Sequence, residues 1–339
     1  MDQTALSQVI QRCNKFNGNT RNLWAFCILN HPHPVGYMLD HHVQKIGWLQ
    51  PEFNIDVARR QVHLNPEVLD GEDEVDKCSQ ALVSLCRENI AAIGSDIEKW
   101  LQRAEDFHSV ASTDMKLFRV AVPTPLRGII GVITRGVHLN VYGVRSVSGE
   151  KQLGVWVAKR SSTVTYANQL DQIAAGAMSP DDRMCHLRTL GREAEEEAGL
   201  ILDWQSKKLA QDGRVIGEPI YSSYVSFYDQ KDRVAGSEIG HLEPGVRYIY
   251  DLFVDSSFIP KPHDQDAIEG FYLLTGRQIV DSLLRNEWKP NSGLVMLDFL
   301  VRNASLVEDG GNLQALRSSL RRRLPFGHIP FDGDDGAAH

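Results

Sequence analysis

The apolar residues of this chain follow two spacings, and together they predict an α+β protein. Runs with the strand period of two, or with continuous β-branched and aromatic residues, recur in both halves of the chain. The predicted strands are 23–28, 35–38, 53–55, 62–64, 118–122, 137–144, 154–158, 215–217, 220–227, 246–254 and 271–274. The helical period of 3.6 predicts helices over 5–16, 75–104, 278–284 and 294–302, with the helix at 75–104 broken near Gly94.

The chain is long enough to bury two hydrophobic cores, because its 339 residues are 42% hydrophobic. An acidic segment at 70–74 interrupts the apolar pattern, and β-type runs dominate from Gly136 onward. We expect an N-terminal α+β domain over 1–130 and a larger domain over 131–310. Over 311–339 we expect a basic helix end followed by a flexible acidic tail.

Charge and cysteine content narrow the possible partners. The net charge of −8 gives no general attraction to nucleic acids or anionic membranes, so we expect neither as a partner. The five cysteines are scattered without Cys-x-x-Cys spacing, which indicates reduced packing residues. We expect a cytoplasmic protein, because the first residues lack signal-peptide features and no apolar run is long enough to cross a bilayer.

The clearest chemical signal is the stretch 192–200, which places several carboxylates on one helix. Glu193, Glu196 and Glu197 stand at i, i+3 and i+4, so they share a face with about 5–6 Å between neighbouring Cβ atoms. Glu195 points elsewhere. A solvated acidic face is the plain interpretation of such a run. The alternative is a cation site, and Mg²⁺ or Mn²⁺, which prefer oxygen ligands, are the candidate ions.

A helix start signal precedes this cluster. Ser179 has the N-cap position, a proline follows in the first turn, and Asp182 holds the capping-box position. Gly191 weakens the middle of a helix that would run as far as Gly199, where a glycine stop is expected. We therefore predict a helix that breaks before Leu187.

The run Arg-Glu-apolar-x-Glu-Glu-x-Gly-apolar over 192–200 is similar to the second half of the Nudix box. The resemblance implies the Nudix α/β/α sandwich with a mixed sheet, preceded here by the smaller N-terminal domain. It also implies hydrolysis of a diphosphate linked to another group, with Mg²⁺ or Mn²⁺ as the cofactor.

Further segments resemble the thiamine-pyrophosphokinase-related branch of Nudix proteins in fungi and plants, in which a domain of unknown function precedes the Nudix domain. These segments are 12–16, 136–140, 156–161, 165–171, 289–291 and 297–302. The resemblance covers roughly 8–305. It implies thiamine diphosphate, or an oxidised or damaged analogue, as the substrate, with the monophosphate and phosphate as products.

The resemblance also implies roles for individual residues. Glu196 and Glu197 would hold the metal against the diphosphate, and Glu193 would be a further ligand or the base that orients water. Arg192 would orient a glutamate through a charge-assisted pair.

The predicted substrate contacts are Lys159 and Arg160, at the end of a predicted strand. Ordinary surface charge is the alternative interpretation for both. We expect a small-molecule diphosphate as the binding partner, and the sequence does not indicate an oligomeric state.

The chain departs from the Nudix pattern upstream of the glutamates. Met178 and Met184 hold the places of the first glycine and the first glutamate. Gly176 stands near the place where relatives have a glycine pair. With altered loop lengths, Asp181 or Asp182 would supply the missing carboxylate.

Three functions stay open. The intact Arg192 and glutamate set favours a metal-dependent hydrolase. The alternative is a catalytically degenerate module that binds a ligand or a protein. It is favoured by the loss of the upstream glutamate and of a later glutamate, whose place Ala267 holds, although Asp264 lies close by in the sequence. The third is isomerisation of an isoprenyl diphosphate, which reuses this fold and needs a site cysteine; Cys185 lies inside the box region.

Overall fold

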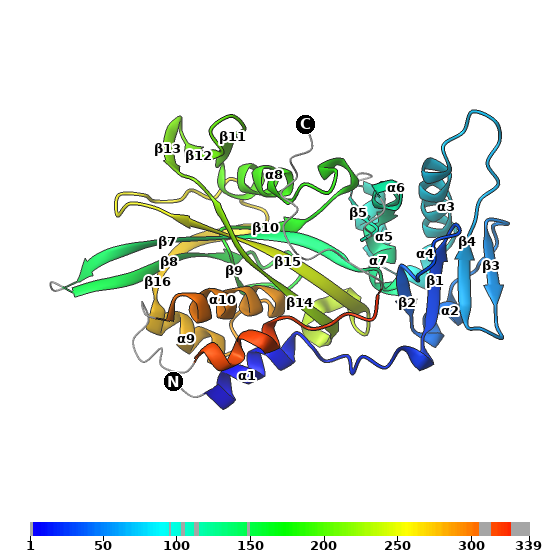
Figure 1. Cartoon of the computed structure of the whole chain (residues 1–339), viewed down its shortest axis with the longest axis horizontal. Helices are drawn as coiled ribbons and strands as arrows, with labels where there is room; N and C mark the ends of the chain where they lie inside the picture. Colours follow the sequence, from blue (N-terminus) through cyan, green and yellow to red (C-terminus); the bar gives the residue numbers. More distant parts are fainter. Residues whose placement is uncertain are drawn as a thin grey trace.

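The computed structural model describes residues 3–94, 96–102, 106–111, 115–147, 150–304 and 313–326. These residues form a smaller α+β unit and a larger unit in which helices cover both faces of a mixed sheet (Figure 1). The α+β class and the sandwich architecture predicted from the sequence are confirmed. The acidic tail expected at the C-terminus lies outside the described residues.

The smaller unit is built on a four-stranded sheet in the order β2-β1-β4-β3. Its strands are β1 (Trp24–Ile28), β2 (Gly36–Met38), β3 (Phe53–Asp56) and β4 (Gln61–Leu64), which confirms the four strands predicted here. Strands β1 and β4 are parallel, and the other neighbours are antiparallel. Around the sheet lie η1 (Thr20–Asn22), α2 (Asp40–Lys45), α3 (Glu74–Glu88), α4 (Ile90–Ile93), α5 (Asp96–Gln102), β5 (Phe107–Ser109), α6 (Met115–Phe118), β6 (Ala121–Pro123) and α7 (Thr124–Ile130).

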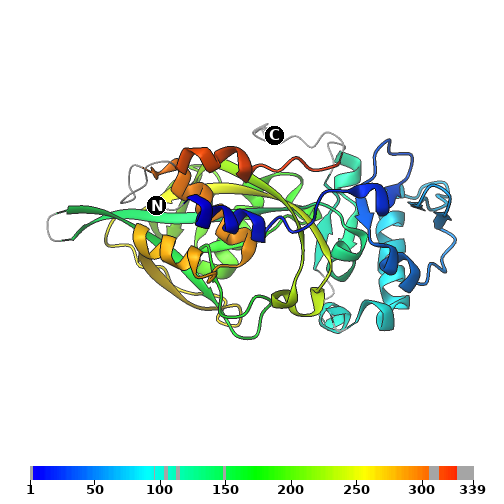
Figure 2. The ribbon, with the colours of Figure 1, turned by 90° about the horizontal axis from the view of Figure 1, so that it is seen from below.

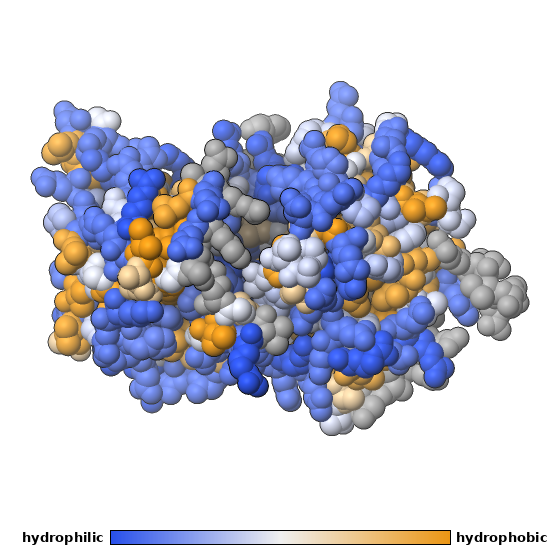
Figure 3. All heavy atoms as spheres, turned by 180° about the vertical axis from the view of Figure 1, so that it is seen from behind, coloured by the Kyte–Doolittle hydropathy of each residue, from blue (hydrophilic) through white to orange (hydrophobic). Residues whose placement is uncertain are grey.

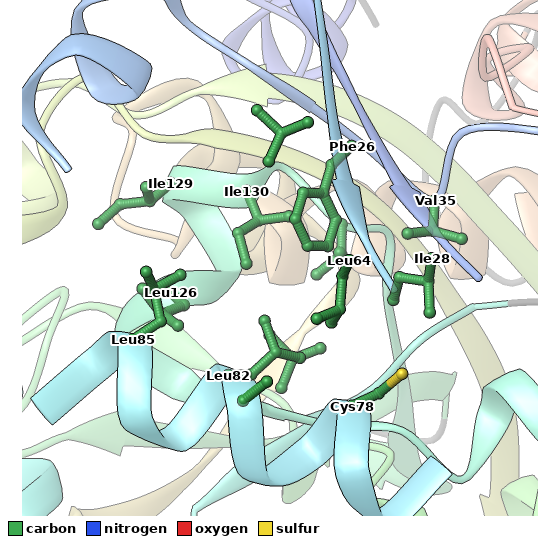
Figure 4. Close-up of a cluster of buried hydrophobic side chains, with 14 of the residues drawn as sticks. Phe26, Ile28, Val35, Leu64, Cys78, Leu82, Leu85, Leu126, Ile129 and Ile130 are labelled. Atoms are coloured by element: carbon green, nitrogen blue, oxygen red, sulfur yellow. The ribbon is translucent and has the colours of Figure 1, made fainter. Parts of the chain in front are cut away.

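Helix α3 and helix α7 enclose the core of this unit against the sheet. Asp73 caps α3 by accepting the N–H of Val75 at 2.8 Å. Figure 4 shows side chains from the strands, from α3 and from α7 meeting in one apolar cluster; they include Phe26, Ile28, Leu64, Cys78, Leu82, Leu85, Leu126, Ile129 and Ile130. The helical spacing of the apolar residues in α3 is thus explained by one buried face.

Two local predictions for this unit have different outcomes. The helix expected over 75–104 is interrupted as predicted, because Gly94 has a φ of 93°, a left-handed backbone that ends α4. The strand predicted over 118–122 is confirmed only at its end, where β6 spans Ala121–Pro123. Helix α6 ends at Phe118, Val120 donates its N–H to the carbonyl of Leu117 in a tight turn, and β6 begins only at Ala121.

The sheet of the larger unit has the strand order β14-β15-β7-β8-β16. Its strands are β7 (Thr134–Val147), β8 (Glu150–Arg160), β14 (Ile220–Gln230), β15 (Leu242–Phe253) and β16 (Ile268–Thr275), with β9 (Leu170–Asp171) and β10 (Ala174–Ala177) attached to β8 and β7. Strands β15 and β7 are parallel, and the other neighbours are antiparallel. The edge of β7 that faces away from β15 has two partners. It pairs with β10 along 136–139 and with β8 along 141–147, so β10 and β8 follow each other along the same edge.

Helices cover both faces of this sheet. Helix α8 (His186–Ala198) lies on one face, followed by a separate meander of β11 (Ile201–Asp203), β12 (Lys208–Gln211) and β13 (Arg214–Gly217). The opposite face carries α9 (Gly276–Leu284), α10 (Pro290–Arg302), α1 (Gln3–Arg12) and η5 (Leu313–Leu320). Figure 2 shows the blue α1 beside the orange helices and the red C-terminal segment, although they are far apart in the sequence. Two short turns, η2 (Pro180–Asp182) and η3 (Arg233–Glu238), complete the unit.

The two units have separate cores. From Val120 to Val132 the buried apolar side chains belong to the core of the smaller unit, and from Ile133 onward they belong to the larger unit. Earlier segments already contribute to the larger unit, because Phe16, Leu23 and Phe118 pack on one face of its sheet and Leu6 and Val9 of α1 on the other. Hydrophilic residues cover most of the face seen in Figure 3, with apolar residues in separate groups. Among the described residues, no helix is both long and apolar enough to span a membrane.

Candidate active site

Helix α8 begins after a capped turn and ends at a left-handed glycine. The turn η2 carries the capping box that the sequence predicts, formed by Ser179 and Asp182. The helix then starts at His186, so the break expected before Leu187 is confirmed. Gly199 has a φ of 61° and ends the helix, as its position after the glutamates indicates.

The outer edge of β10 receives polar side chains from α8. The N–H of Ala175 donates to Oε2 of Glu197 at 2.8 Å. The carbonyl of Ala177 accepts from Nη2 of Arg192 at 2.9 Å. Side chains of α8 therefore bind the backbone groups that β10 does not share with β7, and this holds the helix at a defined position beside the strand.

Arg192 connects three carboxylates. Its Nη1 donates to Oε1 of Glu193 at 2.7 Å and lies 3.4 Å from Oε2 of Glu196. Its Nη2 lies 3.3 Å from Oδ2 of Asp182. Burial opposes the charge of the guanidinium, but Glu193 and Asp182 outweigh it and raise the pKa of Arg192. The pair with a glutamate is the contact that the sequence predicts for this arginine.

Asp182 is the aspartate of the turn before α8 that reaches Arg192. Asp182 is buried, and its Oδ2 accepts from the hydroxyl of Thr189 at 3.0 Å as well as from Arg192. Of the two aspartates considered from the sequence, Asp181 is exposed to solvent. Asp182 thus anchors the arginine of α8 from the preceding turn.

Asp264, the later candidate, has a local role. Its Oδ1 accepts the backbone N–H groups of Asp266 and Ala267 at 3.0 and 3.1 Å, so it stabilises its own turn. The same loop contacts the end of α8, because His263 donates its N–H to the carbonyl of Glu197 at 2.9 Å.

Glu193 occupies space that only a glycine leaves open. A Cβ built on Gly176 in β10 would lie 1.8 Å from Cδ of Glu193, and 1.9 and 2.2 Å from its two carboxylate oxygens. No side chain tolerates such a distance, so the glycine of β10 admits the carboxylate. This contact gives a physical reason for a glycine at position 176.

Glu193 and Glu197 carry raised pKa values. Burial is the main cause for both, and a neighbouring carboxylate adds to it: Glu196 for the pKa of Glu193, and Glu193 for the pKa of Glu197. Arg192 offsets only part of this effect at Glu193. A bound cation would favour the charged forms of both side chains, and carboxylate oxygens are the donors that Mg²⁺ and Mn²⁺ prefer.

The three predicted ligands do not stand as a preassembled coordination group. Within the described parts of the chain, no three His, Cys, Asp or Glu side chains are grouped so that they could hold a metal ion. The reason is that Arg192 bonds both Glu193 and Glu196, while Glu197 bonds the backbone of β10. Glu196 has a side chain that is 57% exposed, so it can turn from Arg192 toward an ion.

Lys159 and Arg160, the two predicted substrate contacts, point to different surroundings, as neighbours in a strand do. Nζ of Lys159 lies 2.9 Å from Oε1 of Glu269. Nη1 of Arg160 donates to the buried Asp171 at 3.1 Å. Of the two, Arg160 lines a cavity beside β10.

This cavity has a volume of about 210 Å³ and shares β10 with the glutamates of α8. The backbone of β10 forms part of its wall, together with His138 and Tyr166. Its charged lining consists of Arg127, Arg160, Asp229, Lys231, Glu238, Glu243, Arg247 and Lys289. Burial lowers the pKa of His138 to about 3, so its imidazole is neutral at physiological pH.

Sequence reasoning missed most of this lining. Arg247 interrupts an apolar strand, and a charge at such a position is a usable signal, because charged side chains are rarely buried without partners. Lys289 lies in a segment noted only for its resemblance to relatives. Arg127 comes from α7 in the smaller unit, and no local pattern connects it with β10.

Two curated proteins show sequence similarity to this chain, whereas no protein-family model matches it. An uncharacterized protein of Saccharomyces cerevisiae is 32% identical over 216 residues, which are 61% of this chain and 58% of that protein. Nudix hydrolase 20 of Arabidopsis thaliana, named as chloroplastic, is 30% identical over 195 residues, or 57% of this chain and 46% of that protein. The chain therefore spans about half the length of the curated relatives it matches.

Solved structures with some likeness include several Nudix proteins. A NUDIX hydrolase from Alicyclobacillus acidocaldarius has a TM-score of 0.35 and 15% identity, covering 56% of this chain and 97% of that one. The NUDIX domain of Shewanella oneidensis NrtR, solved with ADP ribose, has a TM-score of 0.30 and 11% identity, covering 43% and 75%. With TM-scores this low, no conclusion about this chain rests on them.

Proposed function

We propose that this chain is a Nudix hydrolase that uses Mg²⁺ or Mn²⁺ to cleave the diphosphate of a small organic molecule. One observation carries the proposal: Arg192 and the edge of β10 hold Glu193 and Glu197 beside a charged cavity. The similarity to a plant protein named as a Nudix hydrolase supports the same class. The favoured substrate is thiamine diphosphate or an oxidised analogue, cleaved to the monophosphate and phosphate.

The residues of α8 would act together on the diphosphate and on the attacking water. Glu193 is bonded to Arg192 through Oε1, which leaves Oε2 to accept a proton from water. Arg192 fixes that carboxylate, and Asp182 fixes the arginine. Glu193, Glu196 and Glu197 would hold the divalent ion. When bound, that ion supplies positive charge to the phosphate oxygens as the P–O bond breaks.

The cavity lining disfavours the isomerase alternative. An isoprenyl diphosphate needs an apolar pocket for its tail, and this cavity is lined mainly by charged and polar residues. The one cysteine in its lining, Cys13, is buried, and burial raises the pKa of its thiol, which makes it a poor nucleophile.

A binding module without turnover is the second candidate. The contacts of Arg192 favour it, because this guanidinium binds both Glu193 and Glu196. Both carboxylates would have to leave the arginine, at least in part, before they could bind a metal ion. Such a module would bind the same charged ligands and leave them intact.

Hydrolysis assays on the full chain test the proposal. The panel contains thiamine diphosphate, its oxidised analogues, oxidised nucleoside diphosphates and ADP-ribose, each with Mg²⁺ or Mn²⁺. We expect release of phosphate or a monophosphate from at least one compound, and loss of about 100-fold or more of that rate in Glu196→Gln. The matched control is Glu195→Gln, one residue away and exposed to solvent, which should keep the wild-type rate.

Two results would contradict the hydrolase. One is the absence of turnover with every compound and both ions, and the other is a Glu196→Gln rate equal to that of the control. Tight binding of a panel member without turnover would instead support the binding module. The cytoplasmic location stays a prediction, and the plant relative's name points to another compartment.

A further inference from the structure

The cavity beside β10 is locally cationic in a chain whose net charge is −8. We propose that this cavity is an anion site that receives a phosphoryl group of the substrate, with Lys289 and Arg247 as its principal contacts. The assignment to the substrate rests on the proposed function. The anion site itself rests on the charges that line the cavity.

One wall of the cavity places two cations on one carboxylate. Nζ of Lys289 and Nη1 of Arg160 both bind Oδ2 of Asp171, at 3.2 and 3.1 Å. The other oxygen of Asp171 accepts from the hydroxyl of Ser292 at 2.6 Å. Asp171 is 2% exposed, so solvent does little to screen this group. The wall therefore carries one positive charge that no carboxylate in the group balances.

A second wall of the cavity repeats this surplus in a chain of ion pairs. Arg127 donates to Glu238 at 2.5 Å, and Lys231 binds the same glutamate. Lys231 also lies 3.4 Å from Glu243, which accepts from Arg247 at 3.2 Å. Three cations thus share two carboxylates. The remaining lining carboxylate, Asp229, lies 3.3 Å from Lys15, which also binds Asp232 at 3.1 Å outside the lining. The lining as a whole carries five cations and three carboxylates.

The buried cations respond to each other. The pKa of Lys289 is lowered because the ammonium is buried and because Arg160 and Arg247 lie near it, and Asp171 compensates only in part. Burial also lowers the pKa of Arg247, and Arg127 contributes to the same direction. An anion between the two walls would lower the free energy of both side chains.

A phosphoryl group fits this arrangement better than a carboxylate does. Its oxygens can accept from guanidinium and ammonium groups on both walls at once, and its charge matches a surplus shared by two walls. The location also fits, because Ala175 lines the cavity and donates its N–H to Glu197, which places the glutamate cluster beside the cavity. A diphosphate with one phosphate at the glutamates would extend its other phosphate into the cavity.

The smaller unit contributes to this site. Arg127 belongs to α7, and its bond to Glu238 joins the two units at the cavity. The smaller unit would therefore complete the wall that recognises the anion.

Titration calorimetry of inorganic phosphate into the full chain, with chloride at equal ionic strength as the blank, tests the anion site. We expect saturable binding that weakens at least tenfold in Lys289→Met, or about 1.4 kcal/mol. Lys289→Arg should restore most of it, and Arg127→Met should weaken it without touching Asp171. The control is Lys77→Met, which removes a lysine paired with Glu72 far from the cavity.

The outcomes separate this inference from the proposed function. Binding that persists in Glu196→Gln while hydrolysis is lost supports a phosphate site that is independent of the catalytic glutamate. Absence of binding in the wild type, or equal binding in Lys289→Met and Lys77→Met, overturns the site. If phosphate binds there but does not compete with a substrate that the chain cleaves, the site takes free phosphate and its assignment to the substrate is wrong.

Discussion

Gly176→Ala is the sharpest test of how the glutamates are positioned. The new methyl carbon would lie 1.8 Å from Cδ of Glu193, whereas carbon atoms in contact are about 3.5 Å apart. The carboxylate must therefore move by about 1.7 Å, which breaks its 2.7 Å bond to Arg192. Misplacement by about 1 Å costs about 100-fold in rate, so we expect kcat/KM to fall at least that much, or about 2.7 kcal/mol in the barrier.

The folded state should tolerate this change. Alanine restricts the unfolded chain and stabilises by about 0.4–1 kcal/mol, which offsets part of the lost packing around Glu193. The matched control is Gly270→Ala in β16 of the same sheet, where the nearest atom to the added carbon is 3.6 Å away, an ordinary contact.

The assay compares kcat/KM and the thermal unfolding midpoint of both variants with those of the wild type. The substrate is one that the wild type cleaves and Glu196→Gln does not. We expect a large loss of rate in Gly176→Ala alone and similar midpoints in all three proteins. A Gly176→Ala variant with the wild-type rate would refute the reasoning, because it would show that the position of Glu193 does not matter for cleavage.

Three further predictions concern stability. The pKa of His138 is lowered to about 3 in the fold, while that of an unfolded histidine is about 6.5. Below pH 6.5 the unfolded state therefore binds a proton that the folded state does not, and about 2 kcal/mol of the free energy of unfolding is lost on going from pH 8 to pH 5. Urea unfolding of His138→Gln should show a free energy of unfolding that depends less on pH over this range. Asp182→Ala leaves the hydroxyl of Thr189 without this acceptor and should cost about 1–3 kcal/mol, whereas the exposed Asp181→Ala should stay within about 0.5 kcal/mol in the same measurement. Leu82→Ala, in the core of the smaller unit, should cost about 2–5 kcal/mol by denaturant unfolding, and a smaller loss would mean that this core can collapse around the missing atoms.

The sequence by itself determined most of the elements and the position of the catalytic candidates. Strand and helix periods depend on which residues face a core, and this information is local, so β1 to β4, α3 and the long strands β7, β8, β14, β15 and β16 were predictable, whereas β9 and β10 were not. The break expected before Leu187 and the glycine at position 199 likewise predicted where α8 starts and stops. The strand expected over 118–122 is shorter in the structure, because Phe118 packs in the core of the larger unit and Val120 in that of the smaller unit.

Only the tertiary structure decided how the glutamates are held and what surrounds them. The contact between Gly176 and Glu193, and the bonds from α8 to the edge of β10, depend on how a helix docks on a strand, which no local period encodes. The cavity is less predictable still. Its lining joins Arg127 from the smaller unit with Lys289, the residue before α10, and long-range packing alone brings charges so distant in sequence into one site.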